Sequence, residues 1–281
     1  MDLYNFVPKV LVVACIVALP WGLRAASDAD NPEFEYACAS EESFNTGQDI
    51  TRPVRRFDIR YQYVNFPRGA DRNIVIFRTD QPFRMSKRWI IDTRLDVPLM
   101  CGKAAYPGRR YKHNQFALSD IFTQFIATYY ASQRWAYGVG IRLLWPTAYR
   151  QNDGLGKYIA NPLVGAHVCL PEISPGSFFE CGVLYAFDYA GKRDYKHISR
   201  IGFWPTFHVM LSQRNFITLY ANQEIVYDFV ADGFMWPFDI TLGRMIGRSL
   251  VASIEAFIPM FRSHNYKPWD CRVEARIGIF F

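Results

Sequence analysis

The sequence predicts an all-β fold, a transmembrane antiparallel up-and-down β-barrel of about twelve strands over residues 52–281. Three observations predict it. Apolar and polar residues alternate with a period of two, the connections between the alternating runs are by turns long and short, and aromatic residues gather near the ends of the runs. A period of two places successive side chains on opposite faces of a strand, so the two faces meet different surroundings.

The alternating runs have the length of about ten residues that a tilted strand needs to cross a bilayer. The run from Phe57 to Tyr63 and the run from Trp135 to Trp145 show the alternation most clearly. The second, sixth and tenth predicted strands alternate least regularly. The predicted strands are 52–63, 72–79, 88–99, 116–130, 134–146, 162–170, 178–189, 199–211, 215–229, 238–245, 249–261 and 271–281.

The odd-numbered connections are long and most even-numbered ones are short, such as those at Ala131, Ser212 and Gly247. Two even-numbered connections, near 79–87 and 171–177, are longer. Long loops on one side and short turns on the other are typical of barrels that cross a membrane.

The aromatic residues decide between a membrane barrel and a soluble β-sandwich, because alternation alone suits both. A soluble core would place its largest rings in the middle of the strands. Two girdles at the strand ends instead indicate two membrane interfaces. The first girdle is predicted from Trp89, Trp135, Phe179 and Phe281, and the second from Tyr63, Trp145, Tyr189, Phe229 and Trp269.

The N-terminus has the pattern of a signal peptide, predicted over residues 1–29. Lys9 precedes a short apolar run that ends at Leu19, and small residues follow. Cleavage after Ala25, Ser27 or Ala29 satisfies the pattern equally well. A lipoprotein processing site at Cys15 is the weaker alternative, because the apolar region before it is too short. Residues 30–51 are polar without a period and are predicted to be a periplasmic N-terminal lead-in.

Composition excludes several classes of protein. Half of the residues are hydrophobic, yet beyond the N-terminus no apolar stretch approaches the 18 or so residues of a membrane-spanning helix. The net charge of +6 is spread among acidic residues rather than gathered in a stripe, which argues against a nucleic-acid partner. No CxxC motif or neighbouring pair of histidines indicates a metal site. No cofactor is expected.

The chain ends in RVEARIGIFF, in which Val273, Ala275, Ile277, Ile279 and Phe281 form one apolar row. With the signal peptide and the alternation, this strand resembles the closing strand of bacterial outer-membrane β-barrel proteins of the small, porin-like kind. The resemblance covers residues 52–281. It implies the outer membrane of a Gram-negative bacterium, contact with lipid and lipopolysaccharide, and recognition of Phe281 by the assembly machinery. It does not imply an activity.

The charged row between these apolar residues would face the lumen. The first and last strands must pair, because no open sheet edge survives in lipid, so their charges should gather on one wall. We expect a passive channel for small charged solutes, with Trp204, Tyr220 and Phe280 narrowing it. The alternative is a non-conducting structural or binding barrel held together by ion pairs. The pore-lining candidates are Arg56, Asp58, Arg60, Asp92, Arg94, Asp96, Arg142, Glu224, Glu255, Arg272, Glu274 and Arg276.

No catalytic residue is predicted, although His197 and Ser199 form an H-x-S pattern. Outer-membrane lipid hydrolases are similar in placing His and Ser two residues apart on a lipid-facing strand, where the histidine activates the serine. Those families follow the serine with asparagine, and Arg200 stands here instead. His113 and His264 are expected in solvated loops.

Five cysteines remain after signal cleavage, so at least one is not paired within the chain. Cys169 and Cys181 flank one predicted turn almost symmetrically and are candidates for a disulfide across the hairpin. Cys101 and Cys271, both near outer strand ends, could be joined through a loop.

Overall fold

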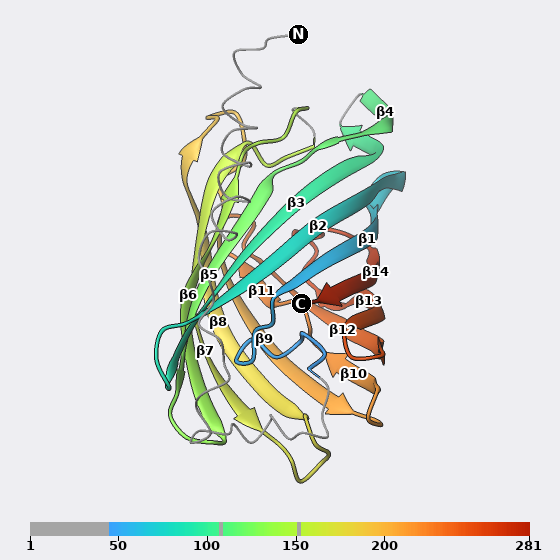
Figure 1. The fold of residues 1–281 in the computed structure, drawn as a ribbon. Coiled ribbons are helices and arrows are strands. Elements are labelled where there is room, and N and C mark those ends of the chain that lie inside the picture. Colours follow the sequence, from blue (N-terminus) through green and yellow to red (C-terminus); the bar gives the residue numbers. More distant parts are fainter. Residues whose placement is uncertain (1–44, 107–108, 151–152) are drawn as a thin grey trace, which may run out of the picture. The chain divides into compact units, whose positions relative to one another are not determined.

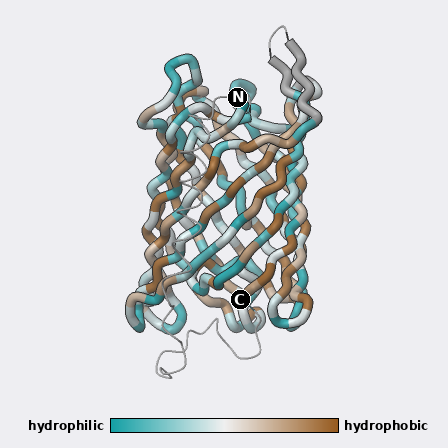
Figure 2. Tube along the Cα trace, turned by 45° about the horizontal axis from the view of Figure 1, so that its top comes forward, coloured by the Kyte–Doolittle hydropathy of each residue, from teal (hydrophilic) through white to brown (hydrophobic). Residues whose placement is uncertain are grey.

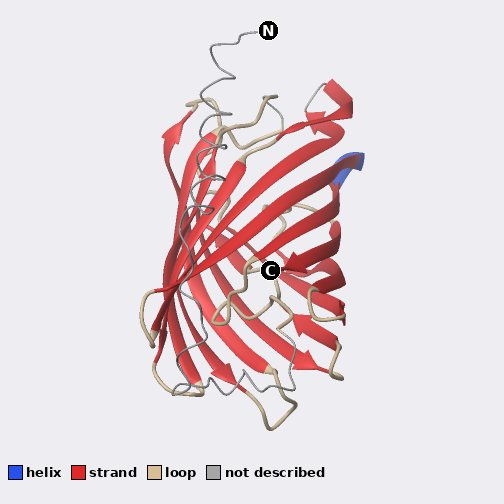
Figure 3. Ribbon diagram, in the orientation of Figure 1, coloured by secondary structure: helices blue, strands red, loops and turns tan. Residues whose placement is uncertain are grey.

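The computed structural model describes residues 45–106, 109–150 and 153–281, so the predicted signal peptide lies outside the described residues. These residues are almost entirely β-strand, apart from loops and one 3-10 turn at Pro67–Gly69 (Figure 3). None of their helices is long and apolar enough to span a membrane. The strands are β1 (Arg56–Phe66), β2 (Ala70–Arg84), β3 (Trp89–Tyr106), β4 (Arg109–Leu118), β5 (Ile121–Tyr130), β6 (Trp135–Trp145), β7 (Lys157–Cys169), β8 (Phe178–Gly191), β9 (Ser199–Met210), β10 (Asn215–Leu219), β11 (Ile225–Asp228), β12 (Gly233–Ile246), β13 (Leu250–Arg262) and β14 (Cys271–Phe280).

The strands form a closed antiparallel barrel, which confirms the predicted fold class. β4 pairs only with the last residues of β3 and is not a separate strand of the barrel wall. β10 and β11 each pair with both β9 and β12, so they are two halves of one barrel strand. Twelve strands therefore enclose the interior. β1 pairs with β14 from Arg56↔Phe280 to Asn65↔Cys271 and closes the barrel (Figure 1). Closure leaves no unpaired edge among the barrel strands, as a lipid environment requires.

The connections are longer overall at one end of the barrel, hereafter the long-loop end, than at the other, the short-turn end. Two connections at the long-loop end, residues 67–69 and 229–232, are short where the sequence predicted long ones. The predicted strand 116–130 is interrupted at Ser119 and Asp120. The Asp120 carboxylate accepts hydrogen bonds from the backbone N–H groups of Ala148 and Leu155, so it connects the junction between β4 and β5 to the loop that follows β6. The predicted strand 215–229 is also interrupted, between β10 and β11.

Apolar and polar residues alternate along the barrel wall (Figure 2). On β1, Phe57, Ile59 and Tyr61 are exposed on the outside, whereas Asp58 and Arg60 between them are buried inside. Trp269 is an exception to the predicted girdles. It is buried at the long-loop end with Val64, Phe257 and other apolar residues, because the loop after β13 folds back over the interior.

The interior is partly filled by apolar packing. One cluster closes the long-loop end around Val64, Met235 and Phe257, and another lies near the short-turn end around Phe216, Met245 and Val251. A third follows one wall from β5 to β9, and Ile50 of the N-terminal segment packs against it. These clusters leave the charged residues a smaller space than an empty barrel would.

Candidate functional site

The site lies in the barrel interior, where the structure places all twelve predicted charged residues. Eight of them line one cavity, and Asp58, Asp92, Glu255 and Arg276 are buried in the wall around it. Whether they line a conducting pore stays a prediction. The eight that line the cavity are Arg56, Arg60, Arg94, Asp96, Arg142, Glu224, Arg272 and Glu274.

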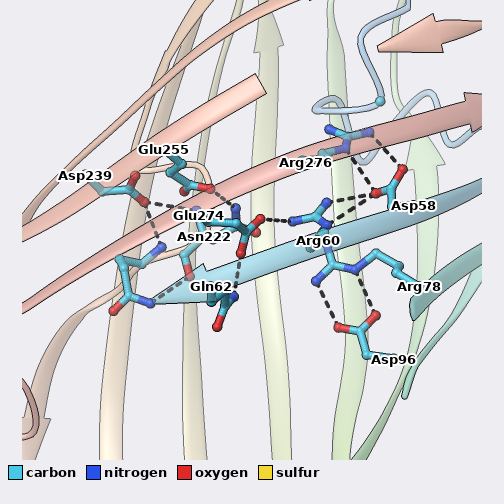
Figure 4. A network of polar contacts seen from close by, with 12 residues as sticks. Asp58, Arg60, Gln62, Arg78, Asp96, Asn222, Asp239, Glu255, Glu274 and Arg276 are labelled. Carbon is cyan, nitrogen blue, oxygen red and sulfur yellow. Dashed lines mark hydrogen bonds and ion pairs between the residues drawn. The ribbon is translucent and has the colours of Figure 1, made fainter. Parts of the chain in front are cut away.

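Asp58 is the centre of the first ion-pair network, at the seam between β1 and β14 (Figure 4). Its carboxylate lies 3.0 Å from Arg60, 3.1 Å from Arg276 and 3.8 Å from Arg56. Arg60 also contacts Glu274 of β14 at 2.9 Å. Alternation brings these residues to one face, and antiparallel pairing of the first and last strands then brings them together, as the sequence predicts.

A second network continues around the wall on β2 and β3. The guanidinium groups of Arg78 and Arg94 both hold the Asp96 carboxylate, each at 2.8 Å. Arg56 is also paired with Asp80. Arg78 and Asp80 lie two residues apart on the interior row of β2, but they were not predicted from the sequence, because the alternation of this strand is weak.

Residues 220–224, hereafter the inward segment, leave the wall between β10 and β11. The backbone N–H groups of Asn222 and Gln223 donate to one oxygen of Asp239 at 3.1 and 3.0 Å, and the Asn222 side chain donates to Glu255 at 2.7 Å (Figure 4). The segment starts at Tyr220, whose φ of 54° is left-handed. Such a conformation is strained for a bulky residue and persists only where surrounding contacts hold it.

Glu224 comes from the inward segment and meets Arg142 of β6 at 3.0 Å. Arg142 is held from two other sides. Its Nε donates to Gln124 of β5 at 2.9 Å, and its guanidinium lies over the Trp204 ring at 5.2 Å from the centroid. From the sequence, Glu224 was predicted to lie within the regular strand 215–229, and Gln124 was not among the predicted pore-lining residues.

A second segment, residues 45–51, also lies in the interior, although the sequence assigned residues 30–51 to a periplasmic lead-in. Its Thr46 lies 3.5 Å from His208, its Asp49 lies 3.7 Å from His167, and the Gly47 carbonyl accepts from Arg56. All three partners face inward from the barrel strands. Residues 30–44 lie outside the described part of the chain.

The cavity between these two segments has a volume of about 290 Å³. Six arginines and four acidic residues line it. The six arginines are Arg56, Arg60, Arg78, Arg94, Arg142 and Arg272, and the acids are Asp96, Glu180, Glu224 and Glu274. Arg272 stacks on Phe257 at 3.9 Å and forms no ion pair with a described residue. The lining therefore carries a surplus of positive charge.

The H-x-S pattern does not form a catalytic pair in the described structure. Ser199 shares a hydrogen bond of 2.8 Å with Tyr185, and the exposed His197 instead contacts Asp188 at 3.2 Å. His264 is exposed, and the side chain of His113 lies outside the described part. Within the described ranges, no group of three or more His, Cys, Asp or Glu side chains is arranged to hold a metal ion.

The predicted disulfide between Cys169 and Cys181 is wrong. Cys181 is a free thiol, whereas Cys169 is disulfide-bonded. The register explains why these two do not meet, because Cys169 pairs with Phe178 and Cys181 with Ala166. Cys169 therefore faces the interior and Cys181 the outside. Cys101 and Cys271 are also free thiols, so the second suggested bridge is wrong too.

Comparison with known proteins relates this chain to outer-membrane barrels by fold. No protein-family model and no curated protein sequence matches it. An outer-membrane channel from Pseudomonas putida F1 superposes with a TM-score of 0.65 at 9% identity, covering 90% of this chain and all of the channel. The KdgM porin (TM-score 0.46, 7% identity) and the NanC porin (0.47, 10%) each cover 80% of this chain, and 99% and 98% of their own chains. The chain therefore has the fold of a bacterial outer-membrane channel.

Proposed function

We propose that this protein is a passive channel in the outer membrane of a Gram-negative bacterium, and that it passes small charged solutes, anions in preference to cations. The observation that carries the proposal is the interior cavity lined by six arginines and only four acidic residues. Arginine presents several N–H donors in a planar fork that matches carboxylate and phosphate groups. Rings of such side chains select anions in pores.

The wall supports a membrane location for this barrel. Its outer face carries many exposed apolar and aromatic side chains, among them Trp89, Trp135, Tyr189 and Phe229. The long-loop end would face the outside, where lipopolysaccharide is the neighbouring lipid, and the short-turn end would face the periplasm. Phe281 is exposed, and recognition of this residue by the outer-membrane assembly machinery is part of the proposal.

Single-channel recording in a planar lipid bilayer tests the proposal. We expect small conductance steps that scale with salt concentration, because residues 45–51 and the inward segment both narrow the lumen. Arg272→Gln removes an unpaired lumenal charge and should lower the ratio of anion to cation permeability. Arg248→Gln, in the short turn after β12, is the matched control and should leave the ratio unchanged.

The competing function is a non-conducting structural or binding barrel, which the apolar clusters and the two interior segments favour. Purified protein that inserts into the bilayer and gives no conductance at any salt concentration would contradict the channel proposal and support this alternative.

A further inference from the structure

The pair between Arg142 and Glu224 differs from the other arginine–acid pairs described for the interior. The pairs of Arg56, Arg60, Arg78 and Arg276 join residues of the same strand or of adjacent strands. Arg142 is on β6, whereas Glu224 belongs to the inward segment between β10 and β11, and β7, β8 and β9 lie between them in the wall. This pair therefore crosses the interior instead of joining one part of the wall.

Arg142 keeps its place without Glu224. Its Nε is fixed by Gln124, which is buried, and its guanidinium face rests on Trp204. Trp204 is in turn held by a hydrogen bond of 3.1 Å from its Nε1 to Glu180. A guanidinium positioned by neutral groups, with its Nη atoms directed into a cavity, is a preorganised binding group for a carboxylate.

The contact between Glu224 and Arg142 is of the kind that a solute in the cavity could replace. The two side chains are 19% and 24% exposed, respectively, and both line the cavity. Water screens such a partly exposed pair more than it screens the fully buried pairs of Asp58. The inward segment also carries backbone strain at Tyr220. The other contacts that hold it are made with Asp239, Glu255, Thr206 and Trp236 rather than with Arg142.

From this geometry we infer that the cavity is a binding site for small carboxylate anions and that Glu224 occupies it as an internal competitor. The carboxylate of the solute would take the place of the Glu224 carboxylate on Arg142, and the inward segment would move away from β6. The volume of about 290 Å³ is near the lower end for small-molecule sites, which suits a solute of a few carbon atoms. The inference rests on the proposed channel function for the entry of the solute, and it adds the class of solute and the residue that competes with it.

The test is isothermal titration calorimetry of the purified, detergent-solubilised protein with succinate at fixed low salt. Glu224→Gln removes the competing charge and should tighten succinate binding about fivefold, because it breaks the weak ion pair between Glu224 and Arg142. Arg142→Gln removes the binding group and should weaken it about tenfold. Glu172→Gln, which alters an exposed pair with Arg134 at the short-turn end, is the matched control and should bind as the wild type does.

Asn222→Ala provides a second variant in case Glu224→Gln does not fold. It removes the hydrogen bond to Glu255 without changing the cavity arginines, so it should also tighten succinate binding by releasing the inward segment. Equal succinate affinity in the wild type and in Arg142→Gln would overturn the inference, as would unchanged or weaker binding in both segment variants.

The binding result and the channel result are separable. Succinate binding that follows this order in a protein without conductance would refute the channel and retain the site. Conductance in a protein that does not bind succinate would retain the channel and refute the site.

Discussion

Asp58→Asn tests the account of the interior most sharply, because it removes one negative charge that three arginines share. Asp58 is completely buried, and Arg60 and Arg276 lie 3.0 and 3.1 Å from its carboxylate. At an effective dielectric constant of 20, each of these two contacts has a gross Coulomb energy of about 5 kcal/mol. Desolvation of the charged groups offsets much of that sum.

The net loss depends on what remains for each arginine. Arg60 keeps Glu274, and Arg56 keeps Asp80, but Arg276 has no second acidic partner among the described residues. Leaving one buried charge uncompensated costs about 3–5 kcal/mol. We therefore expect the free energy of unfolding to fall by that amount. Combining Asp58→Asn with Arg276→Gln should cost less than the sum of the two single changes, since the two residues are coupled.

Urea unfolding of the folded barrel in lipid vesicles, followed by tryptophan fluorescence, measures these differences. Asp71→Asn is the matched control, because its partner Lys103 is more than half exposed and such pairs contribute about 1 kcal/mol or less. An Asp58→Asn barrel as stable as the Asp71→Asn barrel would refute the assignment of Asp58 as the centre of a buried network.

Two further predictions concern packing and thiols. Gly182→Ala should destabilise the barrel by about 1–3 kcal/mol, because the added methyl group overlaps the Trp204 ring. Gly138→Ala is the control, because its added methyl group would lie 3.7 Å from the nearest side-chain atom, on Ile126. Equal stabilities of the two variants in the urea assay would contradict this packing. Alkylation of denatured, unreduced protein, read by mass spectrometry, should spare Cys169, and labelling of Cys169 before reduction would contradict the thiol assignment. Among the described cysteines, those that should react are Cys101, Cys181 and Cys271.

The barrel could be predicted from the sequence because its main determinant is local. Residues two apart share a face, and the closure of the barrel follows from the absence of free edges in lipid. The charges of β1 and β14 could therefore be placed on one wall without knowing any distance. The structure confirms this placement, because Arg60 lies opposite Arg276 and Gln62 lies opposite Glu274 in the pairing of β1 with β14.

The inward segment was not predicted, because the strands on either side of it share one period. Thr218 and Val226 both face the interior, so the alternation resumes in phase after the break. The local sign of the break is the run of three polar residues Asn222, Gln223 and Glu224, which interrupts the alternation. Its cause is distant in the sequence, since the segment is held by Asp239, Glu255 and Arg142 from other strands.

The cysteine pairing failed for a different reason. Two residues can flank a turn almost symmetrically and still face opposite sides, because the register of the hairpin decides the face. The turn between β7 and β8 pairs Cys169 with Phe178, and that register comes from the packing of the whole hairpin. Residues 45–51 were misplaced because they have no period and their contacts lie on distant strands.

The zero-current potential across a planar bilayer with a tenfold gradient of KCl tests the central claim most directly. We predict that purified wild-type protein carries current and that the potential has the sign set by chloride, because arginines outnumber acidic residues in the lining of the cavity. A potential with the sign set by potassium, or inserted protein that carries no current, would contradict it.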